Sequence, residues 1–123
     1  MAGHDRKHIA VVDDDETTIS IYQSMLQDRY DIFTTTDPEL FLKHIRKNPP
    51  DLLIVDLLMP EMDGLELVHI VSRDFDIPTI AVSSTSASST ISKALHDFNA
   101  YIYKPLKADE LLATIEDNIE TQI

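Results

Sequence analysis

Residues 51–64 read DLLIVDLLMPEMDG, and their first part is an unbroken apolar run between two aspartates. Such runs, rich in branched side chains, are typical of a strand buried on both faces of a parallel sheet. We therefore predict a strand over 52–56 with Asp56 at its carboxyl end. Pro60 cannot donate to a sheet ladder and Asp63–Gly64 is a turn pair, so a rigid loop follows. Ligands bind at this edge of open α/β sheets, which makes Asp56 a candidate site residue.

The overall composition is that of one globular domain. The chain has 123 residues, 43% of them hydrophobic and 26% charged, and it has no cysteine, which excludes disulfides and thiolate metal sites. No apolar run approaches the roughly 20 residues of a membrane span. Residues 1–8 lack the apolar core of a signal peptide. We predict a flexible tail or cloning remnant over 1–8, one domain over 9–123 and a cytoplasmic location.

The net charge is −12, from 22 acidic and 10 basic residues. Direct binding to nucleic acid or to an anionic membrane requires a basic face, so neither is expected as a partner. Most of the acids are interpreted as a solvated surface. The informative acids are those that follow apolar runs.

Apolar runs and helical periodicity alternate along the chain. Besides 52–56, the predicted strands are residues 9–12, 30–35, 77–82 and 100–104. The predicted helices are residues 17–27, Pro38 to about Asn48, residues 65–73, a fourth helix through Ile91–Phe98 and a fifth from Asp109 to Ile119. Asp15 is expected to cap the first helix. The hydroxyl-rich residues 83–90 have two interpretations: a mobile segment that orders on a signal, or an ordinary lead-in to a helix.

This alternation predicts an α/β fold. Five strands joined by helices require a parallel sheet with right-handed crossovers and helices on both faces. We predict a doubly wound five-stranded parallel sheet in the order 2-1-3-4-5. In that order the direction of winding reverses between the first and third strands, where such sheets bind ligands.

Polar side chains follow four of the predicted strands. Asp13 and Asp14 follow the first strand, Asp56 ends the third, Ser83 follows the fourth and Lys104 ends the fifth. The sheet order brings all of these to one edge. Two carboxylates about 5 Å apart repel by roughly 3 kcal/mol at an effective dielectric constant near 20, so three of them require a cation or shifted pKa values.

The residue types at this edge predict a hard divalent cation. Oxygen ligands with no nearby histidine or cysteine favour Mg²⁺, with Mn²⁺ possible as a substitute. Such an ion usually bridges to a phosphate group, and Lys104 and Ser83 can supply charge and a hydrogen bond to phosphoryl oxygens. A carboxylate beside the metal can itself attack phosphorus and form an aspartyl phosphate.

Four motifs of the sequence together carry a specific resemblance to a known family. The motifs VVDDD (11–15), IVDLLMPEMDG (54–64), IAVSS (80–84) and YIYKP (101–105) occur in one order and spacing. They resemble the receiver domain of two-component response regulators, over residues 9–121. The family has the flavodoxin-like (βα)₅ fold with strand order 2-1-3-4-5, so the resemblance and the predicted sheet order are not independent.

The resemblance assigns a role to each residue of the edge. Asp56 would be the phosphoacceptor, and Asp14, Asp56 and the backbone carbonyl of Leu58 would hold Mg²⁺ directly, with Asp13 acting largely through water. Lys104 would pair with the acceptor and then with the phosphoryl group.

The resemblance also implies a switch. Ser83 would be the switch hydroxyl, and Tyr101 would be the aromatic side chain that swings inward when Ser83 moves. Four positions depart from the common family pattern: Ser83 replaces Thr, Ser84 replaces Ala, and Asp97–Phe98 replaces Gly-Ala before the fifth strand. Since Ser83 keeps the hydroxyl, the switch chemistry is preserved.

The implied function is a phosphorylation-switched signalling receiver in a phosphorelay. The phosphoryl donor would be a sensor histidine kinase or a histidine phosphotransfer protein. An unspecified downstream effector would read the face made by the fourth helix, fifth strand and fifth helix. Such a domain catalyses its own phosphorylation and dephosphorylation without being a conventional enzyme, and it acts as a monomer or as a phosphorylation-dependent dimer.

Two other functions fit parts of the pattern. A Mg²⁺-dependent phosphohydrolase also uses an aspartyl phosphate, but it would favour an Asp-x-Asp pair and a cap domain, and Leu58 stands two residues after Asp56. A receiver-like scaffold would bind its partner without phosphorylation. The five histidines are scattered, and no metal role is assigned to them.

Overall fold

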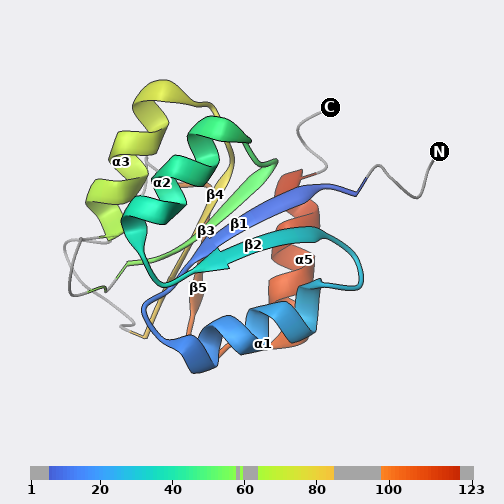
Figure 1. Ribbon diagram of the computed structural model, residues 1–123. Helices are drawn as coiled ribbons and strands as arrows, with labels where there is room; N and C mark the ends of the chain where they lie inside the picture. The colour runs from blue at the N-terminus through green and yellow to red at the C-terminus, as the bar shows by residue number, and fades with distance from the viewer. Residues whose placement is uncertain (1–5, 58, 60–63, 85–97, 120–123) are drawn as a thin grey trace.

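The computed structural model describes residues 6–57, 59, 64–84 and 98–119. Its five strands form one sheet in the order β2-β1-β3-β4-β5 (Figure 1). Every pair of neighbouring strands is parallel. The strands are β1 (His8–Val12), β2 (Asp31–Thr35), β3 (Leu52–Asp56), β4 (Thr79–Ser83) and β5 (Ala100–Tyr103). The predicted doubly wound parallel sheet and its strand order are confirmed.

Helices cover both faces of the sheet. The described helices are α1 (Glu16–Leu26), α2 (Pro38–Lys47), α3 (Gly64–Asp74) and α5 (Ala108–Ile119). Figure 1 shows α2 and α3 on one face and α1 and α5 on the other. The helix predicted through Ile91–Phe98 and most of the hydroxyl-rich segment 83–90 lie outside the described residues.

Alternating side chains of the central strands build two cores. In β1, Ile9 and Val11 pack with the α1 and α5 residues, whereas Ala10 and Val12 pack with the α2 and α3 residues. This alternation follows from the two-residue period of a strand. Because both faces are covered, every residue of β3 and β4 is buried, which explains the unbroken apolar runs.

Aspartates start two of the helices. The Asp15 carboxylate accepts a hydrogen bond from the Thr17 backbone N–H at 3.0 Å, which confirms the predicted cap of α1. Asp37 caps α2 in the same way, through the Glu39 N–H at 2.9 Å. Pro38 then occupies the first turn of α2, where a missing N–H costs no hydrogen bond.

The ends of four strands differ slightly from the prediction, and among them β2 begins at Asp31 rather than at Tyr30. β4 starts at Thr79 and includes Ser83, because Pro78 has no N–H to donate while Ser83 still pairs with Tyr103. β5 ends at Tyr103, so Lys104 is the first residue after it. β1 begins at His8, within the segment predicted as a tail. No helix among the described residues is long and apolar enough to cross a membrane.

Candidate functional site

Three aspartates meet at the carboxyl edge of the sheet. Asp13 follows β1 and Asp56 is the last residue of β3; these strands are neighbours, with Val12 paired with Val55. One carboxylate oxygen from each of Asp13, Asp14 and Asp56 lies within 4.8 Å of the other two. Asp13 and Asp56 are buried, at 0% and 3% exposure, while Asp14 is exposed. The structure therefore concentrates negative charge at one partly open point.

Lys104 places a cation against the two buried acids. Its Nζ atom lies 3.0 Å from Asp13 Oδ2 and 3.5 Å from Asp56 Oδ2. The backbone fixes this approach, because the Lys104 N–H donates to the Ser83 carbonyl at 2.9 Å as β5 leaves the sheet. Burial lowers the pKa of Lys104, but the close contact with Asp13 and the charge of Asp56 outweigh it, so that the pKa is raised overall. The side chain is an ammonium ion at neutral pH.

Asp13 is held by its neighbours yet keeps one oxygen with acceptor capacity. Its Oδ1 atom accepts a hydrogen bond from the Asp15 backbone N–H at 2.9 Å. Its Oδ2 atom is buried and makes no well-directed hydrogen bond; the contact with Lys104 Nζ is an ion pair by distance. A buried carboxylate oxygen without a directed donor is a strong candidate for a cation ligand.

The donor set fits a hard divalent cation. All three ligand groups are carboxylates, and the described residues offer no histidine or cysteine in the group. Oxygen-only sites of this kind suit Mg²⁺, and also Mn²⁺. Leu58, whose carbonyl the family resemblance assigns to the metal, lies outside the described residues.

Ser83 and Tyr101 lie together on the next strands. Ser83 is 1% exposed, and it follows Val82, which is paired with Asp56. Burial raises the pKa of Tyr101, and a side-chain hydrogen bond with Ser83 partly offsets this rise. The Tyr101 ring also meets Tyr103 edge-on, with ring centroids 4.7 Å apart. The tyrosine therefore already reaches the serine in this structure.

Gly64 is a site-supporting residue that the sequence analysis treated only as part of a turn. It is the first residue of α3, and its N–H donates to the Leu57 carbonyl at 3.2 Å. A Cβ atom at this position would lie 2.3 Å from the Asp56 carbonyl oxygen and 2.5 Å from Leu57 Cα. The helix can approach the end of β3 this closely only because the residue is glycine. The sequence signal for this role is the spacing of eight residues between Asp56 and Gly64. The prediction of a turn at Asp63–Gly64 did not take that spacing into account.

A shallow, mostly apolar hollow opens beside Lys104. Its volume is about 360 Å³, and it is lined by Thr18, Ile21, Ser84, Lys104, Pro105 and Leu106. Ile21 is one of the few large apolar side chains exposed on the described surface, at 40%. The hollow thus joins the acidic edge to an apolar contact area between α1 and the start of α5.

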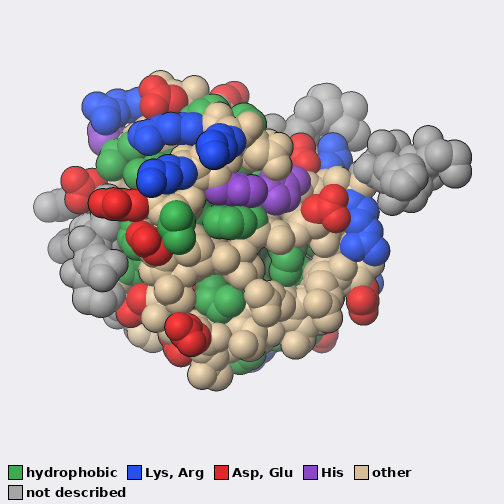
Figure 2. All heavy atoms as spheres, in the orientation of Figure 1, with side chains coloured by type: hydrophobic (Ala, Val, Ile, Leu, Met, Phe, Trp, Pro, Cys, Tyr) green, Lys and Arg blue, Asp and Glu red, His purple; other side chains and the backbone are tan. Residues whose placement is uncertain are grey.

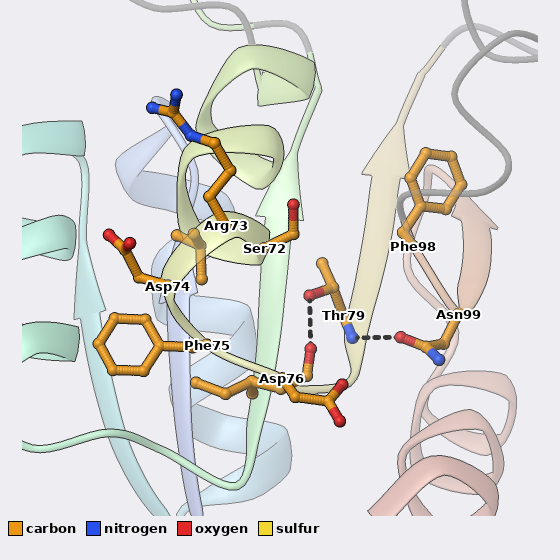
Figure 3. Close-up of a pocket in the computed structure, with 10 residues that line it drawn as sticks. Ser72, Arg73, Asp74, Phe75, Asp76, Thr79, Phe98 and Asn99 are labelled. Atoms are coloured by element: carbon orange, nitrogen blue, oxygen red, sulfur yellow. Dashed lines mark hydrogen bonds between the residues drawn. The ribbon is translucent and has the colours of Figure 1, made fainter.

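A second hollow, of about 520 Å³, lies at the other end of β4 (Figure 3). There the Thr79 N–H donates to Asn99 Oδ1 at 2.8 Å and the Thr79 hydroxyl donates to the Ile77 carbonyl at 3.1 Å. These bonds order the turn before β4. Because Thr79 starts the strand that Ser83 ends, this hollow is separate from the acidic edge.

Solved structures with the same architecture include receiver domains. The receiver domain of a putative LuxO repressor protein from Vibrio parahaemolyticus matches with a TM-score of 0.87 and 21% identity, covering 94% of this chain and 92% of that one. A CheY-like receiver domain protein from Methanospirillum hungatei JF-1 matches with a TM-score of 0.87 and 24% identity, covering 95% and 96%. At these identities the likeness establishes the fold.

The sequence comparisons establish the family. The family model described as the response regulator receiver domain matches residues 9–116. The two-component response regulator ARR10 of Arabidopsis thaliana is 36% identical over 107 residues, which are 84% of this chain and 19% of the relative. ORR24 of Oryza sativa subsp. indica is 34% identical over 107 residues, 84% of this chain and 17% of the relative. The chain belongs to the response regulator receiver domain family, and its match spans less than a fifth of these relatives.

Proposed function

We propose that this receiver domain accepts a phosphoryl group on Asp56 from a phosphohistidine of a sensor histidine kinase or a histidine phosphotransfer protein. One observation carries the proposal: the Asp56 carboxylate is nearly buried, 3.5 Å from the Lys104 ammonium and grouped with two further aspartates. A carboxylate held in this way is a nucleophile whose developing charges have fixed partners.

The charge balance explains why a divalent cation is part of the proposal. Three carboxylates and one ammonium leave a formal charge of −2 at the edge, which disfavours the approach of an anionic phosphoryl group. Asp13, Asp14 and Asp56 would hold Mg²⁺, with Mn²⁺ as a substitute and the Leu58 carbonyl as a further ligand. The bound ion would neutralise this charge and that of the phosphoryl oxygens.

The chain's own residues then carry out the transfer. An oxygen of Asp56 forms the new bond to phosphorus, and the bond from phosphorus to the donor's imidazole nitrogen breaks. The electron pair stays on that nitrogen, and the ring leaves as neutral imidazole when its other nitrogen carries a proton, which comes from the donor protein or from water. Lys104 Nζ is close enough to follow the charge from the carboxylate to the phosphoryl oxygens. Attack by water on the same phosphorus later returns phosphate and the free Asp56 carboxylate.

The hollow beside Lys104 supplies the route for the donor. Asp56 is only 3% exposed, so the phosphohistidine must approach through an open side of the edge. Lys104 forms part of the hollow's wall, and Ile21 and Leu106 offer apolar contact for a partner. We propose that the donor protein packs on this apolar rim while its imidazole points at Asp56.

The switch proposal rests on Ser83 and Tyr101. A phosphoryl group on Asp56 offers oxygens to the Ser83 hydroxyl, which is now hydrogen-bonded with Tyr101. Competition for the hydroxyl would couple phosphorylation to the Tyr101 side chain and to the face made by the predicted fourth helix, β5 and α5, where Tyr103 of β5 is 49% exposed. A downstream effector, or a second copy in a phosphorylation-dependent dimer, would read that face. The proposal includes self-catalysed phosphorylation and dephosphorylation, and a cytoplasmic location.

Intact-mass measurement tests the phosphoacceptor directly. The protein is incubated with Mg²⁺ and acetyl phosphate, beside Asp56→Asn and a control, Asp109→Asn, which removes an exposed acid from the first turn of α5. One phosphoryl adduct is expected on the parent and on the control, and none on Asp56→Asn. A folded, Mg²⁺-stabilised parent with no adduct would reject the proposal in favour of a phosphorylation-independent scaffold.

A further inference from the structure

Two histidines from distant parts of the chain meet away from the acidic edge. The Nε2 atoms of His8, at the start of β1, and His44, on α2, are 2.7 Å apart. The ring centroids are 5.0 Å apart, and the difference from the nitrogen–nitrogen distance is accounted for by the radius of each ring. The rings therefore point at each other, with one nitrogen lone pair and one N–H along the same line. That is hydrogen-bond geometry.

Neighbouring groups settle which nitrogen carries the proton. His8 Nδ1 lies 3.0 Å from the Asp31 carbonyl oxygen, which can only accept. In neutral His8 the proton is therefore on Nδ1, and its Nε2 atom accepts. His44 Nε2 must then donate to His8 Nε2, which leaves His44 Nδ1 as the open proton site of the pair.

Further contacts hold both residues in place. Phe33 of β2 stacks on His44 with ring centroids 3.9 Å apart and planes 3° apart. The His8 backbone N–H donates to Asp51 Oδ2 at 2.8 Å, which holds the start of β1. Figure 2 shows histidine side chains side by side next to α2, beneath a group of Lys and Arg side chains. The contact thus ties α2 to the amino end of β1.

We propose that His8 and His44 form a single proton-binding clamp that keeps α2 on β1 while it holds at most one added proton, and that a second proton opens it. The first added proton enters at His44 Nδ1, and the resulting cation still donates from Nε2 to His8, now as a charge-assisted bond. The second would have to enter at His8 Nε2, where the His44 N–H already points. Two N–H groups and two like charges would then face each other, and the rings must separate.

Acidic groups lie near His8, and basic groups lie near His44. Asp51, which precedes β3, binds the His8 backbone, and Asp31 is on β2. On α2, Lys43 and Lys47 lie one residue before and three residues after His44, and Lys47 shares its face of the helix. Burial lowers the pKa of His44, and a positive charge on His8 would lower it further. The inference is independent of the proposed phosphoacceptor function.

Side-chain NMR of the imidazole nitrogens tests the clamp in the intact chain. Above neutral pH, His8 is expected as the Nδ1–H tautomer and His44 as the Nε2–H tautomer. On acidification the two rings should report the same two proton-binding steps, separated by more than about one pH unit. The α2 backbone signals should shift with the second step. The opposite tautomers, or two rings that titrate independently in single steps, would overturn the proposal.

Variants supply the controls. In His8→Gln and His44→Gln the remaining ring should show one step, since its partner is gone. His69→Gln removes an exposed histidine of α3 and should leave both steps unchanged. The tautomer measurement needs no variant, so a failure of either glutamine variant to fold leaves the proposal testable. Retention of two steps in a folded His44→Gln protein would also overturn it.

Discussion

Replacing Lys104 by methionine should destabilise this domain and make its stability depend more strongly on divalent cations. The change keeps most of the side-chain volume and removes one positive charge. That charge lies 3.0 Å from Asp13 Oδ2 and 3.5 Å from Asp56 Oδ2. What remains is a group of three carboxylates, two of them buried, without the ammonium.

The distances set the scale of the effect. At an effective dielectric constant near 20, each Lys104 ion pair is worth about 5 kcal/mol before the cost of dehydration. Each pair of carboxylate oxygens at the outer separation of 4.8 Å is repelled by about 3.5 kcal/mol. Removing one partner of a buried ion pair typically costs about 3–5 kcal/mol. Because the Lys104 side chain is 20% exposed, we expect a loss of about 2–4 kcal/mol in unfolding free energy without metal.

Urea unfolding with and without Mg²⁺ measures this. In chelator, Lys104→Met should unfold at a clearly lower urea concentration than the parent, and saturating Mg²⁺ should restore more stability to the variant than it adds to the parent. The matched control is Lys107→Met, which removes an exposed lysine that takes part in no ion pair among the described residues. If Lys104→Met and Lys107→Met were equally stable in chelator, the ion pairs would contribute nothing net and the electrostatic reasoning would be wrong.

Three further predictions concern the rest of the molecule. Mg²⁺ should raise the unfolding free energy of the parent by about 2.7 kcal/mol at 100 times its dissociation constant, and millimolar Mg²⁺ without any shift in melting temperature would reject the metal site. Gly64→Ala should lower the unfolding free energy by about 1–3 kcal/mol and weaken Mg²⁺ binding, because its Cβ would fall 2.3 Å from the Asp56 carbonyl oxygen. The control is Glu66→Ala, on the exposed side of α3. A Gly64→Ala variant as stable as this control would contradict the steric argument. The pKa of His44 is lowered on folding, so just below pH 6.5 the unfolded chain binds more protons than the folded one. The unfolding free energy should therefore fall as the pH drops through that range. Urea midpoints should show a smaller fall in His44→Gln.

The sheet could be predicted because the apolar composition of each central strand shows in the sequence itself that the strand is buried. Residues such as Leu52 and Ile80 have no exposed face in a doubly covered parallel sheet, so apolar runs mark them locally. The convergence of Asp13, Asp56 and Lys104 then follows from strand order alone, since parallel strands end at one edge. The strand boundaries were less predictable; Ser83 belongs to β4 because its backbone pairs, although its side chain is polar.

Contacts that join residues far apart in sequence left no local signal. His8 and His44 are 36 residues apart, and neither lies in a motif that predicts the other. The close approach of Gly64 to the backbone after Asp56 depends on the path of a loop, and a turn pair predicts the bend but not its neighbour. The roles of Asp56, Leu58, Ser83 and Tyr101 in phosphorylation remain predictions that the experiments above test.

Asp15 illustrates how one position can serve two structures with different atoms. Its carboxylate caps α1 through the Thr17 N–H and the Thr18 hydroxyl, and these bonds lower the pKa of the Asp15 side chain. Its backbone N–H holds Asp13. The acidic edge requires only a backbone N–H at this position, which any residue except proline supplies. The side chain is constrained only by its role in capping α1. Related sequences should accordingly be free to exchange Asp15 for another capping residue, such as serine or asparagine, without loss of the acidic edge.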